Sequence, residues 1–278
     1  SNQVLKRKKE TYAKVKLIKW IIIVVAFLLF LFGILPIYIV IILIILSILM
    51  GSIAANDYTK IYKNEIIKTL IETELQGLTY HPEEGMNRKD YETAGFEKFD
   101  RYYSEDLIKG TVNGLPYIFS EVHTEEETTD SDGNTTYNTI FHGSVVRMEL
   151  NFNIGAFIYT VKNANNYNHL RNDYYQTIDN EAFEKRYDVF SDNKILAMRM
   201  LTPDVTNTIL DLETETNIYM EFKIFGNLVY FRFYTKNIFE PCLEDDLEEA
   251  KNIALYMTMM ENIQKIMNYI IESLEGVK

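Results

Sequence analysis

The sequence has little cysteine, proline or tryptophan, and one long stretch lacks charge altogether. Its 278 residues include one Cys, five Pro and one Trp. The single cysteine, Cys242, excludes an internal disulfide and suits a reducing compartment. Residues 21–56 contain no charged side chain. A chain with an apolar run of this length is not a soluble single-domain globule.

Catalytic motifs are missing as well. The sequence has no phosphate-binding Gly-rich loop and no G-x-S-x-G, H-E-x-x-H or C-x-x-C motif. We therefore expect no enzymatic activity and no cofactor. No later segment is apolar for long enough to cross a bilayer, which excludes a polytopic transporter.

Charge divides the chain into two unlike parts. Residues 1–56 contain seven basic side chains and one acidic side chain, so they carry a formal charge of +6. The whole chain carries −12, which leaves −18 on residues 57–278. An acidic region of this size repels phosphate, so we do not expect nucleic acid as a partner.

The apolar run is too long for one membrane span. From Trp20 to Ala55 a straight helix would be roughly 54 Å long, whereas the hydrocarbon core of a bilayer is about 30 Å thick. Gly33 and Pro36 near the middle favour the end of one helix and the start of another. We predict a transmembrane hairpin with spans over residues 17–35 and 36–55. Its predicted anchor residues are Trp20, Gly33 and Pro36.

Two alternatives remain for this run. One is a single kinked span. The other is a secretory signal peptide, because Ser52-Ile53-Ala54 resembles a cleavage site, although the run far exceeds the usual apolar length of such peptides. In the two-span prediction the basic N-terminus lies in the cytoplasm, and two crossings return the chain there. We therefore expect an inner (cell) membrane protein with both termini cytoplasmic and the lipid bilayer as a partner.

The rest of the sequence predicts an α+β fold. A helical pattern over residues 58–76 continues from the second span, and strand patterns begin at Leu107. Asn113-Gly114 and Gly226-Asn227 are typical of tight hairpin turns. We expect an antiparallel sheet followed by a long C-terminal helix over residues 243–274. The predicted domains are the basic N-terminus with its hairpin (1–56), a juxtamembrane helix and connection (57–106) and the cytoplasmic α+β domain (107–278).

Several short strings, in their order after a membrane hairpin, resemble a bacterial family of two-span membrane proteins, domain of unknown function family 3137. The resemblance covers roughly residues 15–275 and implies a membrane protein with a cytoplasmic domain. The family supplies no known activity, so no catalytic residue is carried over. The strings are Glu105-Asp106-Leu107-Ile108-Lys109-Gly110, Phe119-Ser120-Glu121-Val122, Phe141-x-Gly143, Glu181-x-Phe183-x-x-x-Tyr187-x-Val189 and Leu201-Thr202-Pro203.

One hairpin brings histidines into possible contact. If the chain turns at Asp132-Gly133, His123 faces His142, and Glu121 lies on the same face as His123. Imidazole and carboxylate groups in this arrangement suit zinc or another divalent ion. The alternatives are a solvated hairpin face without metal, and a turn at Gly133-Asn134 that moves the histidines out of register.

The C-terminal helix carries an apolar seam at spacings of three and four residues. The seam either packs on the protein's own sheet or helix, which we favour, or mediates contact with a partner or a second copy. The residues that would make such a contact are Ile253, Met260 and Met267.

These observations predict a membrane-anchored cytoplasmic domain that binds a partner or scaffolds an assembly, without catalysis. The alternative function is a two-span membrane effector or sensor that oligomerises and perturbs the bilayer on a signal.

Overall fold

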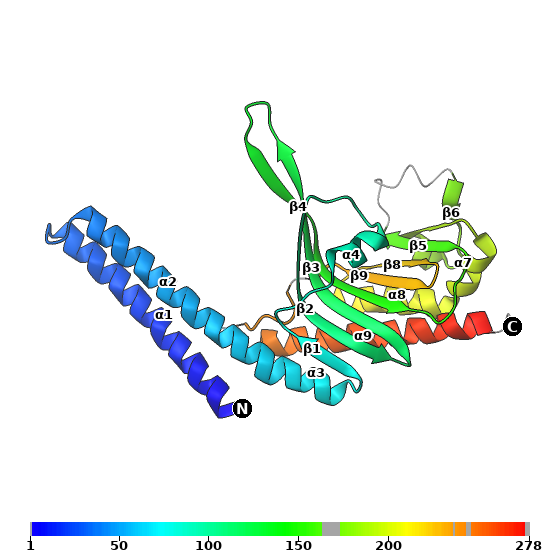
Figure 1. The fold of residues 1–278 in the computed structure, drawn as a ribbon, viewed down its shortest axis with the longest axis horizontal. Helices are drawn as coiled ribbons and strands as arrows, with labels where there is room; N and C mark the ends of the chain where they lie inside the picture. The colour runs from blue at the N-terminus through cyan, green and yellow to red at the C-terminus, as the bar shows by residue number, and fades with distance from the viewer. Residues whose placement is uncertain (1, 163–172, 236, 243–245, 276–278) are drawn as a thin grey trace. The chain divides into compact units, whose positions relative to one another are not determined.

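The computed structural model describes residues 2–162, 173–235, 237–242 and 246–275. These residues form two compact units (Figure 1). The first comprises Ser1–Leu70 and Glu240–Glu249, and the second comprises Ile71–Phe239 and Ala250–Lys278. Residues 71–106, predicted as part of a connection, therefore fold with the sheet.

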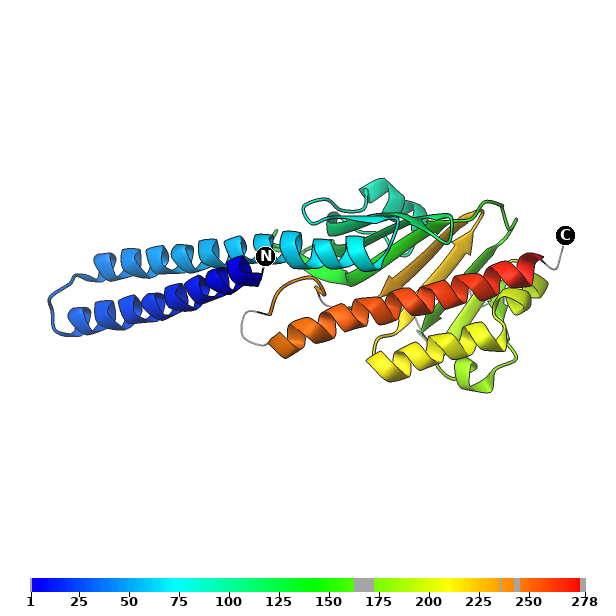
Figure 2. The same cartoon turned by 90° about the horizontal axis from the view of Figure 1, so that it is seen from below.

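The first unit contains two long helices that lie side by side, α1 (Asn2–Leu31) and α2 (Ile37–Tyr62) (Figures 1 and 2). Between them Gly33 has a φ of +69°, a conformation that glycine adopts without strain. Pro36 is the N-cap residue of α2. After Tyr62 the helix continues through a π-helical turn, η1 (Lys63–Ile67), and α3 (Lys68–Glu74), so the helix predicted over residues 58–76 is confirmed as a continuation of α2.

The second unit is built on a nine-stranded antiparallel sheet with the strand order β1-β2-β3-β4-β9-β8-β5-β7-β6. The α+β class with an antiparallel sheet and a long C-terminal helix is thus confirmed. The strands are β1 (Leu78–His81), β2 (Arg101–Val112), β3 (Leu115–Thr129), β4 (Thr135–Glu149), β5 (Phe157–Lys162), β6 (Tyr175–Gln176), β7 (Tyr187–Ser191), β8 (Met220–Phe225) and β9 (Leu228–Phe233). The helices of this unit are α4 (Arg88–Ala94), α6 (Glu181–Glu184), α7 (Lys194–Met200), α8 (Pro203–Thr216) and α9 (Asp246–Glu275).

Local signals in the sequence explain several of these boundaries. Asn113 and Gly114 both have positive φ angles, 52° and 77°, as a two-residue hairpin turn between β2 and β3 requires. The two-residue turn between β8 and β9 has a positive φ at Gly226 only, 60°. The side chain of Thr202 caps α8 by accepting a hydrogen bond from the amide of Val205, with Pro203 in the first turn.

Helices cover both faces of the sheet. On one face lie α8 and α9, and α4 lies on the other (Figure 2). The hydroxyl of Tyr117 in β3 donates to the sulfur of Met260 in α9 at 2.7 Å, and Phe119 packs edge-on against Tyr256. On the α4 face, the hydroxyl of Tyr230 in β9 donates to the carbonyl of Asp90. Both faces of the central strands are therefore buried.

Candidate functional site

The part of the first unit from Trp20 to Ile53 presents an almost entirely apolar surface. Trp20 is 56% exposed, and the large apolar side chains of α1 and α2 from Leu17 to Ile53 are mostly exposed in the same way. A soluble protein rarely exposes a contiguous apolar patch of this size. Among the described residues, one helix is long and apolar enough to cross a membrane, Ile37–Glu74. This unit therefore contains one candidate membrane-spanning helix.

Polar residues of the two helices meet at one end of the pair. Lys8 Nζ in α1 lies 3.5 Å from Asp57 Oδ2 in α2. The aliphatic stem of Lys19 approaches Gly51, where an added Cβ would lie 3.5 Å from the lysine Cδ. The basic start of α1 and the polar continuation of α2 thus share one end of the unit.

In the second unit, three rings lie in a row across neighbouring strands. Tyr103 in β2 pairs with His123 in β3, which pairs with His142 in β4. The His123 and His142 ring centroids are 4.9 Å apart, and the Tyr103 and His123 centroids are 5.7 Å apart. The predicted register is therefore confirmed, and the alternative register is wrong. Towards the tip, a bulge after Thr124 shifts the pairing by one residue.

These rings line a pocket of about 230 Å³, which we call the histidine pocket. The pocket is open to solvent. It lies on the same face of the sheet as α9. Its walls are formed by Tyr103, Ser104, Glu105, Glu121, Val122, His123, His142 and Asn237.

Each histidine is oriented by a polar neighbour. His123 Nε2 lies 3.0 Å from the hydroxyl oxygen of Thr139 and 3.6 Å from Glu125 Oε1. His142 Nε2 lies 2.6 Å from Asn237 Oδ1, a carbonyl oxygen that only accepts, so this nitrogen carries the hydrogen. That tautomer leaves the Nδ1 lone pair of His142 available to a ligand.

Partial burial lowers the pKa of His123 below its usual value, and the neighbouring His142 lowers it further, whereas Glu125 opposes the shift. The lowered pKa favours the neutral imidazole of His123, which is the form that binds metals.

The third predicted ligand, Glu121, already accepts hydrogen bonds from the protein backbone. Its Oε1 accepts hydrogen bonds from the amides of Ile238 at 2.6 Å and Phe239 at 3.3 Å. Glu121, His123 and His142 line one pocket, but their ligand atoms do not all lie within 4.8 Å of one another. The metal site stays a prediction, and occupancy would require the side chains to move.

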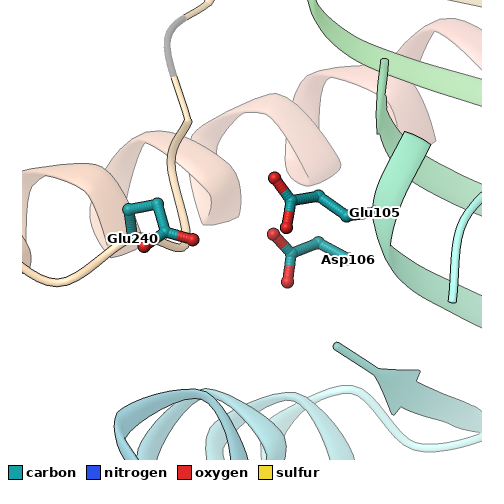
Figure 3. Close-up of side chains that lie close together, drawn as sticks. All are labelled: Glu105, Asp106 and Glu240. Atoms are coloured by element: carbon teal, nitrogen blue, oxygen red, sulfur yellow. The ribbon is translucent and has the colours of Figure 1, made fainter. Parts of the chain in front are cut away.

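A bulge in β2 brings two further carboxylates to one side of the strand. Glu105 pairs with Glu121, but the next pair is Ile108 with Phe119, so β2 contains one extra residue here. Asp106 has a φ of 58° and is fully buried, and Tyr80 donates a hydrogen bond to it. Adjacent strand residues normally point to opposite faces, whereas Figure 3 shows Glu105 and Asp106 side by side.

The methionines proposed for a partner contact lie in the protein's own core. Met260 and Met267 are 2% and 1% exposed, and Ile253 is half-buried. This agrees with intramolecular packing of the seam, because a contact with another molecule requires exposed side chains. The expected start of this helix at Leu243 lies outside the described residues.

Sequence reasoning missed a buried ionic cluster on the α4 face. Arg232 is 3% exposed, and its guanidinium contacts Glu221 Oε2 at 2.6 Å and also the carboxylate of Glu97. The hydroxyls of Tyr91 and Tyr234 lie within hydrogen-bond distance of the same guanidinium. The turn at Gly226-Asn227 is enough to predict that Arg232 faces Glu221 across β8 and β9. It does not predict that other elements cover both faces of β9 and so bury this pair.

These observations define an α+β protein with an apolar helical N-terminal region. Residues 139–274 match DUF3137, a protein family of unknown function. The match runs from β4 to α9, and the family resemblance is confirmed for this part.

No curated protein matches the chain. A crystal structure of the mycobacterial trehalose monomycolate transport factor A, TtfA, is similar at 10% sequence identity with a TM-score of 0.36. The similarity covers 73% of this chain and 94% of that one.

Proposed function

We propose that this chain is a non-catalytic, membrane-anchored binding protein, with α1 and α2 as a two-span hairpin and the sheet unit in the cytoplasm. The exposed apolar surface of α1 and α2 carries the proposal. The apolar part of α2, about 19 residues, is roughly 28 Å long, close to the ~30 Å thickness of the hydrocarbon core. The uncharged part of α1, residues 20–31, lies beside it and is 12 residues or roughly 18 Å long, and the turn at 32–35 extends this apolar stretch.

Charge supports the orientation. The basic start of α1 lies beside Asp57 at the polar end of α2, so both ends of the hairpin are on one side. Lysine and arginine near membrane spans favour the cytoplasmic side. The acidic remainder of the chain follows on that side.

Cysteine accessibility tests this topology. In a Cys242→Ser background, single cysteines replace Glu10, Ile34 and Asp132, and a membrane-impermeant maleimide is applied to intact cells and to inverted membrane vesicles. We expect the cysteine at position 34 to react in intact cells, and those at positions 10 and 132 to react only in inverted vesicles. A single span would place positions 10 and 132 on opposite sides, and that labelling pattern would refute the hairpin.

The histidine pocket is the binding site of the sheet unit in this proposal. It combines two imidazoles, carboxylates and an exposed aromatic ring, Tyr103, in one concave surface, as ligand sites commonly do. A photo-crosslinking amino acid at Tyr103 should capture the partner in cells, whereas the same probe at the exposed Thr214 in α8 should not. Equal products from both positions would count against the pocket. The alternative function, a bilayer-perturbing effector, stays a prediction.

A further inference from the structure

A second cavity of about 230 Å³ lies between the two helices of the first unit, and we call it the interhelical crevice. It has a polar and an apolar end. Lys8, Thr11 and Asp57 line the polar end, and the apolar walls are formed by Val15, Met50, Ile53 and Ala54. The lining changes from charged to apolar over about two helical turns. This change in polarity is complementary to that of an amphiphilic molecule.

The crevice lies at the depth of lipid headgroups if the proposed function is correct. Trp20 and Lys19 are residue types found at membrane interfaces, and the side chain of Lys19 lies near Gly51 of α2. Met50 to Asp57 therefore run from this interface towards the cytoplasm. The volume equals that of about eight water molecules at roughly 30 Å³ each, enough for a glycerol backbone and its first methylene groups.

The charged residues around the crevice determine which kind of lipid headgroup it would bind. Lys8 is paired with Asp57, but both side chains are about half exposed, so the pair adds little stability and opens at small cost. Before position 20 the sequence contains six further basic residues and one acidic residue, Glu10. A basic segment of this composition next to a membrane span attracts anionic lipids.

We infer that the interhelical crevice binds one anionic phospholipid of the cytoplasmic leaflet. Lys8 contacts the phosphate, and Val15, Met50 and Ile53 contact the glycerol and the upper acyl chain. This inference rests on the proposed membrane placement of α1 and α2.

Native mass spectrometry of the full chain, released from nanodiscs that contain palmitoyl-oleoyl phosphatidylglycerol or phosphatidylcholine, tests the inference. We expect one retained phosphatidylglycerol per chain and at least fivefold less phosphatidylcholine. Ala54→Trp fills the crevice without changing charge and should abolish retention. Ala13→Trp, at an exposed position of α1 that does not line the crevice, is its control and should bind normally.

Charge variants separate a defined site from general attraction. Lys8→Gln should lower phosphatidylglycerol retention about fivefold, the effect of one basic residue near an anionic surface. Lys14→Gln removes the same charge outside the crevice and should change retention less than twofold. Equal losses in these two variants, or normal retention by Ala54→Trp, would overturn the inference.

Flotation of the reconstituted chain with liposomes distinguishes the two proposals. A chain that floats without a retained lipid refutes the crevice alone. A chain that does not float refutes the membrane anchor itself.

Discussion

His123 and His142 face each other across β3 and β4 with their ring centroids 4.9 Å apart and their planes 27° from parallel. The contact occurs in the histidine pocket, beside Tyr103 and Asn237. Two imidazoles this close do not both accept protons readily, because like charges repel at short range. We therefore expect this part of the sheet to be sensitive to pH, and metal binding by the pair stays a prediction.

Acid should destabilise the sheet unit through His123. Its pKa is lowered in the folded state, so the unfolded chain binds the proton more tightly. Stability is then present above the unfolded pKa of about 6.5 and is lost as pH falls through the lower folded pKa. We expect His123→Gln to lose less stability than the wild type between pH 7 and pH 5 in thermal unfolding. Parallel curves for the two proteins would contradict this role.

Zinc binding tests the predicted metal site. Isothermal titration of the detergent-solubilised protein should give one Zn²⁺ per chain, with at least tenfold weaker binding in His123→Ala and His142→Ala. His81→Ala is the matched control, since His81 lies in β1 and does not line the histidine pocket. Unchanged binding in His123→Ala would exclude this site.

Loss of Arg232 should be severe. Arg232→Met leaves the carboxylates of Glu221 and Glu97 without their buried guanidinium, and breaking a buried pair in this way costs about 3–5 kcal/mol. Glu221→Gln keeps a hydrogen-bond acceptor and leaves Glu97 opposite the arginine, so a smaller loss is expected. Thermal unfolding of both variants measures which of them loses more stability. Equal stability of Arg232→Met and the wild type would contradict the prediction.

The apolar seam of α9 should contribute to the stability of the fold as part of the hydrophobic core. Met267→Ala removes a buried side chain and should cost about 2–5 kcal/mol. The exposed Glu261→Ala, on the same helix, should change stability by less than about 0.5 kcal/mol. Light scattering should show the same oligomeric state for both variants. A change of oligomeric state in Met267→Ala with unchanged stability would instead support the partner-binding role.

Local features of the fold were predictable because their signals are local. Asn113-Gly114 and Gly226 supply the positive φ angles of two hairpins, and Thr202-Pro203 starts a helix. The pairing of His123 with His142 was predicted from a turn, but the register at the observed tip reaches this pair only through the bulge after Thr124.

Non-local features were not predictable in this way. The bulge at Asp106 and the short strand β1 depend on pairing across the chain, not on a sequence pattern. The burial of Arg232 depends on α4 and the segment that carries Glu97 covering that face of β9. The commitment of Glu121 to the amides of Ile238 and Phe239 joins positions more than 100 residues apart.

The sequence by itself determined an uncharged apolar run, a basic segment before it and a strongly acidic remainder, because hydropathy and charge are properties of composition along the chain. Only the tertiary structure decided which side chains those properties leave accessible. It buried Met260 and Met267 against the sheet, opened a pocket beside His123 and His142, and placed Lys8 next to Asp57. The physical reason is that burial depends on which surfaces pack together, and packing joins residues that no local pattern connects.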